Sequence, residues 1–299
     1  MIVRERPNAF VLFFILKGAV VHRIWPQLLG VGILSGIIVT AHRLEPLFVP
    51  GVNPAAFALI GISISIFLSF RNSASYERWW EARQQWGLII QSSRDIARQS
   101  AILDGDAPVA SPARRALLEP LIAYAKACVA QLHQEELPYS APVTPQGQIS
   151  APDAILTGLA KQVSQHLHAG RLAPVEAHLL NESLTRLSHA FVACERLANT
   201  PLPFAYTLLL HRTAYIFCLM LPFGLADSIG WFTPLAVMLV AYTFFGLDAL
   251  ADELEQPFGQ MPNDLPLIAY SVVIERAMLA AMGEKDLPPA AEPHDYILR

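Results

Sequence analysis

The chain has 299 residues, of which 54% are hydrophobic and 15% charged, and its mean hydropathy is +0.39. The charged fraction is well below the ~25% typical of soluble domains, which indicates a membrane protein. The net charge is −4 and the sequence contains no basic tract, so we expect no nucleic-acid partner.

Four apolar stretches are each long enough to cross ~30 Å of hydrocarbon as a helix. They lie at about residues 24–41, 55–70, 203–226 and 232–249. None has the amphipathic pattern of a helix on a soluble domain, so buried core helices are the weaker interpretation. We therefore expect an all-α membrane protein with four transmembrane helices.

The basic residues predict how these spans are oriented in a cell inner membrane. Basic residues gather before the first span and after the second: Arg4, Arg6, Lys17, Arg23, Arg71, Arg78 and Arg83. The short segments 42–54 and 227–231 hold only Arg43. Because basic residues favour the cytoplasmic side, we expect a multi-pass protein with both termini in the cytoplasm.

An apolar N-terminal run, 10–21, resembles the hydrophobic part of a signal peptide. Lys17 interrupts this run, and no cleavage site with small residues follows it before the first span. We expect a helix that lies near the inner membrane surface.

The second span passes directly into a charged segment, and no Gly or Pro separates the two. This pattern predicts one long helix that leaves the bilayer and continues to about Leu103. Within it, Ile62, Ile66 and Phe70 recur every four residues and share one face. The same face continues with polar and acidic residues: Ser73, Glu77, Glu81 and Gln84.

An apolar ring followed by acidic rings is one way to line a pore. A single stripe encloses nothing, so a pore needs copies of the chain around a symmetry axis. Hydrophobic constrictions of this kind gate ions by dewetting. The alternative is ordinary helix packing, which produces the same spacing.

The region between the second and third spans has helical spacing and is expected in the cytosol. Ser111 is expected to cap a helix that begins at Pro112 and ends near Glu136. Further helices are expected at about 153–168 and 174–199. The prolines of 200–203 then turn the chain back into the membrane. We find no internal repeat, which argues against a transporter built from inverted repeats.

Ionisable residues inside the third and fourth spans must face protein or water. Arg212 and Asp248 lie at matching depths in helices joined by a short loop, so we expect them to form a buried ion pair. A structural salt bridge is favoured over a role in the ion pathway, because Arg212 is not on the stripe that contains Ile62.

The remaining candidate sites carry little chemistry. Cys128, Cys194 and Cys218 are far apart in sequence and are expected as reduced thiols without a metal. His166 and His168 lie two apart, which on a helix turns the side chains to different faces. No catalytic or phosphate-binding motif is present, so we expect no enzyme activity, no cofactor and no metal site.

Three segments of the sequence resemble the bestrophin family, most closely its bacterial members. These segments are FLSFRNSASYERWWEAR, CERLANTPLPFAYTLLLHRTAYIFCLMLPF and ALADELEQPFGQMPNDLPL. The resemblance covers nearly the whole chain apart from about 100–170. It implies a single channel unit over 1–299, with cytosolic helices over about 71–202 and 250–299, that assembles as a homopentamer in membrane lipid.

The resemblance also implies roles for individual residues. The second helices would form a narrow neck at Ile62, Ile66 and Phe70, and a second constriction would lie at the cytosolic exit near Val175. Animal members carry an acidic calcium clasp after a P-F-G motif, whereas here Asn263 and Asp264 are only a weak remnant. Calcium prefers six to eight oxygen ligands, so calcium activation is not expected.

The sign of the conducted ion is the harder question. Five copies of Glu77 and Glu81 would place carboxylates just inside the neck, which favours cations. The resemblance to bacterial members implies small monovalent cations, whereas the animal members favour anions. A salt-bridged helix surface is an equal alternative for these two glutamates. Arg71 counts against cations, although it lies ~100° off the stripe and is free to pair elsewhere. The competing functions are an anion (chloride) channel of the same fold, a small membrane transporter or receptor, and a membrane enzyme.

Overall fold

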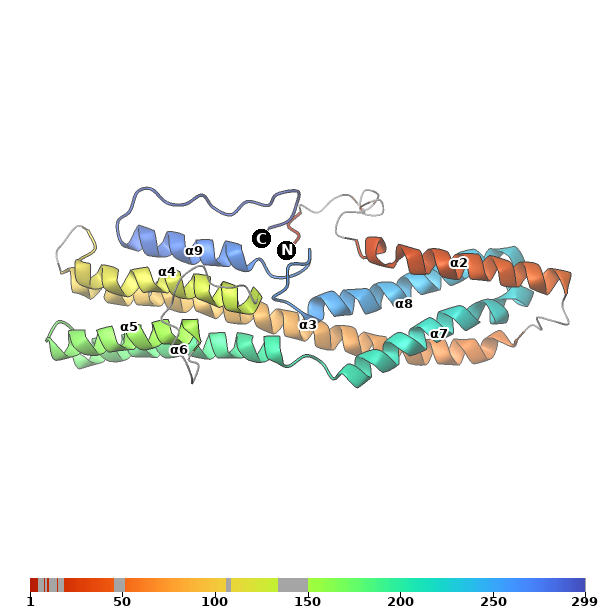
Figure 1. The fold of residues 1–299 in the computed structure, drawn as a ribbon, viewed down its shortest axis with the longest axis horizontal. Coiled ribbons are helices and arrows are strands. Elements are labelled where there is room, and N and C mark those ends of the chain that lie inside the picture. The colour runs from red at the N-terminus through yellow and green to blue at the C-terminus, as the bar shows by residue number, and fades with distance from the viewer. Residues whose placement is uncertain are drawn as a thin grey trace. The chain divides into compact units, whose positions relative to one another are not determined.

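Helices make up most of the backbone that the computed structural model of the chain describes. It describes residues 1–4, 8, 10, 15, 19–45, 52–105, 109–133 and 150–298. The surface helix expected over 10–21 falls largely outside these residues and stays a prediction. The elements, in chain order, are α2 (Val21–Leu44), α3 (Pro54–Gln99), η1 (Ser100–Asp104), α4 (Pro112–His133), α5 (Ala151–His168), α6 (Pro174–Asn199), α7 (Phe204–Ile229), η2 (Gly230–Phe232), α8 (Thr233–Glu255) and α9 (Leu267–Ala281) (Figure 1).

The helices form two compact units. One, here called the apolar unit, comprises Glu5–Trp79 and Pro201–Gln256. The other, here called the terminal unit, comprises Met1–Arg4, Trp80–Thr200 and Pro257–Arg299. Helix α3 begins in the apolar unit and ends in the terminal unit.

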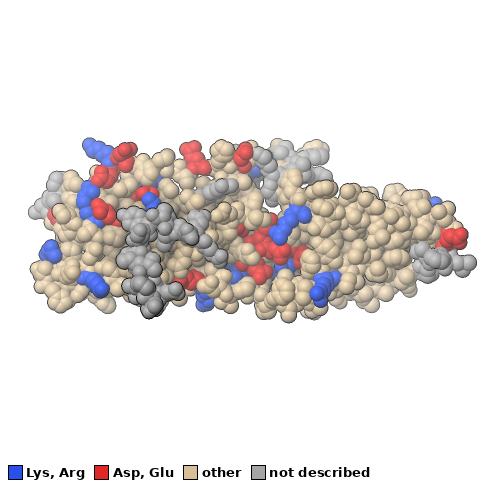
Figure 2. Space-filling model, in the orientation of Figure 1, with Lys and Arg blue, Asp and Glu red and all other residues tan. Residues whose placement is uncertain are grey.

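The apolar unit contains the helices expected to cross the membrane. Three continuous helical stretches are long and apolar enough to do so: α2, the stretch that starts with α3, and the stretch over 204–255. The third contains two helices, α7 and α8, which are joined by the short turn η2. At ~1.5 Å per residue, α7 and α8 each exceed the ~30 Å of a hydrocarbon core. On the face that Figure 2 shows, charged side chains are rare on the surface of these helices except near their ends.

The core of the apolar unit lies where α2, α7 and α8 pack against one another. Its buried side chains include Val31 of α2, Phe217 of α7, and Val237 and Phe245 of α8. Helices α3 and α7 approach closely at Gly224, where a Cβ would lie 2.6 Å from the ring of Phe57. A side chain larger than hydrogen does not fit there without a shift of this aromatic ring.

In the terminal unit, α4 packs against both α5 and α9, and α5 packs against α6. Figure 1 shows α4 beside α9 and α5 beside α6. The hydroxyl of Tyr124, buried on α4, donates a hydrogen bond of 3.0 Å to the carbonyl of Leu187 on α6. The terminal half of α3 contributes the fully buried side chains of Trp86 and Ile89 to this unit.

Helix boundaries agree closely with the expected ones. Ser111 caps α4 as predicted, because its Oγ accepts a hydrogen bond of 3.2 Å from the amide of Arg114. Helix α4 ends at His133, and 134–149 lie outside the described residues. Helix α6 has the predicted bounds of 174–199. The expectation that 1–299 act as a single channel unit stays a prediction.

The two ends of the chain pair with each other inside the terminal unit. The Met1 amino group donates to the Leu298 carbonyl at 2.6 Å, and the Leu298 amide donates to the Met1 carbonyl at 2.8 Å. Ile2 and Ile297 form an antiparallel bridge beside this pair. The labelled ends therefore lie together in Figure 1.

Candidate functional site

Helix α3 has two different faces within the apolar unit. Ile64 and Leu68 are 3% and 1% exposed and pack into the core of the chain. Ile62, Ile66 and Phe70 are 59%, 50% and 62% exposed. The predicted neck residues are therefore no part of this chain's own core, and they are available to lipid, water or another chain.

Two serines near this stripe bond to the backbone of their own helix. The hydroxyl of Ser63 donates to the Leu59 carbonyl at 3.0 Å, and that of Ser65 donates to the Gly61 carbonyl at 2.8 Å. Hydroxyls that bond to their own backbone offer little to passing water. The helix surface around Ser63 and Ser65 is therefore more apolar than these two residues suggest.

The two acidic residues that follow the stripe differ in their surroundings. Glu77 is exposed and has no ion-pair partner within the described part of the chain. Glu81, in the terminal unit, forms an ion pair with Arg196 of α6. One of the two carboxylates expected along a pore is thus largely neutralised by a neighbouring cation. Glu81 thus fits the alternative of a salt-bridged helix surface, whereas the pore-lining role stays a prediction for Glu77.

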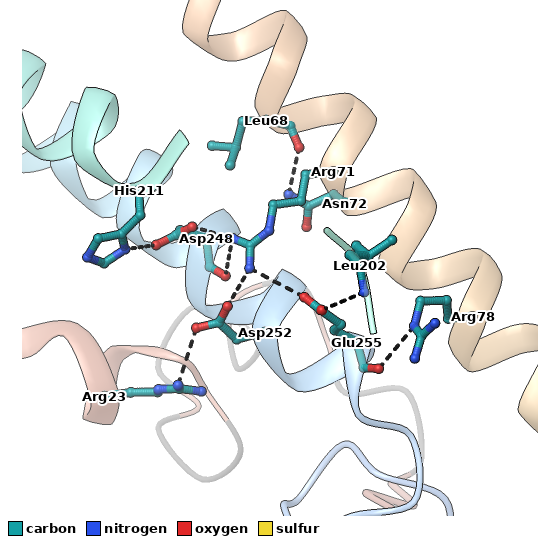
Figure 3. Close-up of polar contacts among 10 residues, drawn as sticks. All are labelled: Arg23, Leu68, Arg71, Asn72, Arg78, Leu202, His211, Asp248, Asp252 and Glu255. Carbon is teal, nitrogen blue, oxygen red and sulfur yellow. Dashed lines mark hydrogen bonds and ion pairs between the residues drawn. The ribbon is translucent and has the colours of Figure 1, made fainter. Parts of the chain in front are cut away.

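A buried arginine lies directly after the stripe, at the centre of a polar network that Figure 3 shows. The side chain of Arg71 is fully buried, and its guanidinium meets three carboxylates of α8. Asp248 and Asp252 form ion pairs with Nη1 and Nη2, and the Glu255 carboxylate lies 3.7 Å from Nη2. These acidic residues are spaced four and three apart, so all of them lie on one face of α8.

Each of these carboxylates also has a second partner in the apolar unit (Figure 3). Nδ1 of His211 on α7 lies 2.7 Å from Oδ2 of Asp248. Arg23 of α2 lies 3.3 Å from the Asp252 carboxylate. The network therefore joins α2, α3, α7 and α8.

Glu255 connects the same network to the segment that precedes α7. Its carboxylate accepts a hydrogen bond of 3.1 Å from the amide of Leu202. Its backbone carbonyl accepts one of 3.2 Å from Nε of Arg78, which lies two turns after Arg71 on α3. Helix α3 is thus attached to the end of α8 at two successive points.

The predicted pair between Arg212 and Asp248 is wrong. Asp248 is buried as expected, but its partners are Arg71 and His211, and Arg212 is exposed. Residues 211 and 212 of α7 do lie level with Asp248 of α8, as expected. Consecutive residues of a helix point ~100° apart, however, and it is His211 that faces α8. The spacing of Asp248, Asp252 and Glu255 was the sequence signal for a cation-binding face, and Arg71 was the cation.

Val175 lies in the first turn of α6 and is 70% exposed. The preceding turn is fixed by the Glu176 carboxylate, which accepts a hydrogen bond of 2.7 Å from the amide of Ala173. An exposed apolar side chain on a well-capped helix end is compatible with the expected exit constriction, which stays a prediction.

The weak calcium-clasp remnant is folded as a tight turn. The Asp264 carboxylate accepts a hydrogen bond of 2.6 Å from the Met261 amide, and the Asp264 amide donates to the Met261 carbonyl at 3.1 Å. Asp264 is buried, and Asn263 precedes it in the same turn. Within the described ranges, no group of three or more His, Cys, Asp or Glu side chains is placed to hold a metal ion.

The cysteines and the histidine pair have ordinary structural environments. Cys128, Cys194 and Cys218 are buried free thiols. Burial raises the pKa of Cys194 to about 12, which disfavours the reactive thiolate. His166 is buried, whereas His168 is exposed and its Nδ1 lies 2.7 Å from the Ser164 carbonyl.

Comparisons with known proteins agree with this architecture. The family model described as bacterial/fungal bestrophin protein matches residues 1–280. A voltage-dependent anion channel-forming protein of Mesorhizobium japonicum is 42% identical, over 98% of this chain and 95% of its own. A protein of Escherichia coli strain K12 with the same description is 34% identical, over 98% of each chain.

A solved structure is similar over most of the chain. The crystal structure of a bacterial bestrophin homologue from Klebsiella pneumoniae has a TM-score of 0.81 and 36% identity, and the match covers 88% of this chain and 100% of that one. The relatives are named as channel-forming proteins rather than enzymes, and their names favour anions over the cations expected from Glu77 and Glu81. The chain belongs to the bacterial and fungal bestrophin family of membrane channels.

Proposed function

We propose that five copies of this chain form an ion channel in the cell inner membrane, with α3 of each copy lining the pore. The main support for this proposal is that α3 has a buried face and an exposed apolar face, the latter at Ile62, Ile66 and Phe70. An apolar stripe outside the core of its own chain is stabilised when symmetry-related copies surround a common axis. In this assembly the three side chains form the narrow hydrophobic neck, and Val175 forms the exit constriction.

In the proposed topology, α2, the first part of α3, α7 and α8 cross the bilayer, and both termini lie in the cytoplasm. The basic residues that precede the first span and follow the second support this orientation, because they gather on the cytoplasmic side. The polar network around Arg71 then lies at the cytoplasmic end of the neck. An ionic cluster of this kind is tolerated near a membrane because its charges pair with one another.

We propose small monovalent anions as the conducted ions. The names of the relatives support this sign, and so does the pair between Glu81 and Arg196, because it removes one of the two acidic rings. A specific observation favours cations as the second candidate. Glu77 is exposed one turn beyond Ser73 on the same face of α3, and five copies would form one acidic ring.

Recording of the purified protein in planar bilayers under a gradient of potassium chloride tests both parts of the proposal. A conducting species that reverses toward the chloride equilibrium potential is the expected result. Reversal toward the potassium potential would replace the anion proposal by the cation candidate. Absence of any conductance from a protein of pentameric mass would contradict the channel itself, and a monomer or dimer in detergent would favour the transporter or receptor alternative.

A further inference from the structure

The last residue of the proposed neck, Phe70, is followed directly on α3 by Arg71 of the buried network. The angle between these two side chains around the helix axis is therefore fixed. Phe70 is mostly exposed, and Arg71, the next residue, is fully buried. Successive residues of an α-helix point ~100° apart, so any contact that holds the Arg71 side chain also holds the direction of Phe70.

The membrane-crossing part of α3 is held against α7 mainly by apolar packing, of Phe57 against Gly224 and Phe217, with one hydrogen bond of 3.1 Å from the Tyr206 hydroxyl to the Phe67 carbonyl. Between residues 55 and 70, only Ile64 and Leu68 are buried within the chain. Apolar contacts are non-directional, so this packing constrains rotation about the helix axis less sharply than a contact with a defined geometry does. A guanidinium is different, because its planar set of donors matches carboxylates in a defined geometry.

The partners of Arg71 are themselves held in place. Asp248 also contacts His211, Asp252 also contacts Arg23, and the Glu255 carboxylate also accepts the Leu202 amide (Figure 3). The three carboxylates that bind the guanidinium are thus held in place by α2, α7 and the segment before α7. The Arg71 guanidinium cannot turn away from these fixed carboxylates without leaving buried charges unpaired, which is costly in free energy.

We propose that Arg71 is a positioning residue of the channel: its ion pairs with α8 set the rotation of α3 and thereby aim Phe70 and Ile66 at the pore axis. This inference rests on the proposed pore neck, and it assigns to the network a role in conduction in addition to stability. Loss of the ion pairs is expected to let α3 rotate and to change which side chains face the lumen.

Cysteine accessibility measures this rotation directly. Phe70→Cys and Ser69→Cys are made separately, each with Arg71 present and each with Arg71→Met. A charged, membrane-impermeant thiol reagent is applied from the cytoplasmic side, and the rate at which the current changes is measured. The three native cysteines are buried, so they contribute little to the signal.

With Arg71 present, cysteine at position 70 is expected to react at least ~10-fold faster than cysteine at position 69, because only the former faces the aqueous lumen. With Arg71→Met, this ratio is expected to fall toward one or to invert. Arg212→Met provides the matched control, since Arg212 is an exposed arginine of the same unit, and it should leave the ratio unchanged.

Two further variants separate rotation from simple loss of folding. When Arg71 is removed, Asp252 keeps Arg23 and Glu255 keeps the Leu202 amide, whereas Asp248, the most buried of the three carboxylates, keeps only the imidazole of His211. Arg71→Met combined with Asp248→Asn removes both charges and is expected to assemble while still showing the altered ratio. Arg71→Lys retains the charge without the planar fork and is expected to give an intermediate ratio.

The outcomes distinguish this inference from the proposed function. If cysteine at position 70 fails to react with Arg71 present, the neck assignment is wrong. If it reacts rapidly there, and the 70-to-69 ratio is the same in every assembled Arg71 variant, the neck stands and the positioning role of Arg71 is overturned.

Discussion

The two halves of α3 are built for different surroundings. In the terminal unit the helix buries large side chains such as Trp86 and Ile89 within its own chain. In the apolar unit, by contrast, the residues of 55–70 are mostly exposed, and Arg71 follows as a buried ionic attachment. One half is therefore stabilised by the core of the monomer, whereas the other is suited to an environment that a single chain does not supply.

This comparison predicts different costs for shortening aromatic side chains in the two halves. Trp86→Ala removes a fully buried side chain and is expected to lower the free energy of unfolding by ~3–5 kcal/mol. Phe70→Ala removes a mostly exposed one and is expected to change it by ~0.5 kcal/mol or less. Thermal unfolding of both variants in the same detergent checks this. Similar losses would contradict the division of α3 into an internally packed half and an exposed half.

The ionic attachment predicts a similar contrast between two arginines of the apolar unit. Arg71→Met leaves the buried Asp248 without its main cation, and breaking a buried pair costs ~3–5 kcal/mol. Arg212→Met changes an exposed residue and is expected to cost less than ~0.5 kcal/mol. Pentamer yield and melting temperature report the difference, and equal behaviour of the two variants would argue against a buried role for Arg71.

The two glutamates beyond the neck predict a smaller effect, on selectivity. In the proposed pore, Glu77→Gln removes an exposed carboxylate from the lining and is expected to raise the ratio of chloride to potassium permeability. Glu81→Gln leaves Arg196 without its partner, which changes the charge of each copy by the same amount as Glu77→Gln, so it is expected to raise the same ratio to a similar extent. Reversal potentials of both variants measure this, and no shift in either would remove the glutamates from the pore lining.

The smallest expected effect is that of calcium. Asp264 folds back on Met261, and the residues before it lack carboxylates, so we predict no activation by micromolar calcium. Ion flux into liposomes should be equal with calcium and with a chelator. A steep rise with calcium would identify a set of ligands other than the turn at 263–264.

Sequence patterns predicted the helices well because strong local signals mark their ends. Pro201 follows the end of α6, and Ser111 with Pro112 marks the start of α4. These signals act within a few residues, so no knowledge of the tertiary structure was needed.

The polar contacts were harder to predict because they depend on the rotation of helices far apart in sequence. Hydropathy gives the depth of Asp248 in its span, but it does not say whether His211 or Arg212 faces it. The pair between Glu81 and Arg196 joins residues 115 positions apart and follows no sequence pattern. A count of acidic residues along one stripe does not show which of them are paired, so it says little about the net charge along that face.

The central claim, that Ile62, Ile66 and Phe70 form a dewetting neck, is tested most directly by replacing all three with Ala and recording single channels. On this claim the variant is expected to have a wider and more easily hydrated lumen, so conductance or open probability should rise while ion sign stays unchanged. Ser63→Ala, whose native hydroxyl bonds only to the Leu59 carbonyl, is the matched control and should leave both unchanged. Lower pentamer yield with unchanged or lost current would contradict the account, because that is the behaviour of a packing stripe.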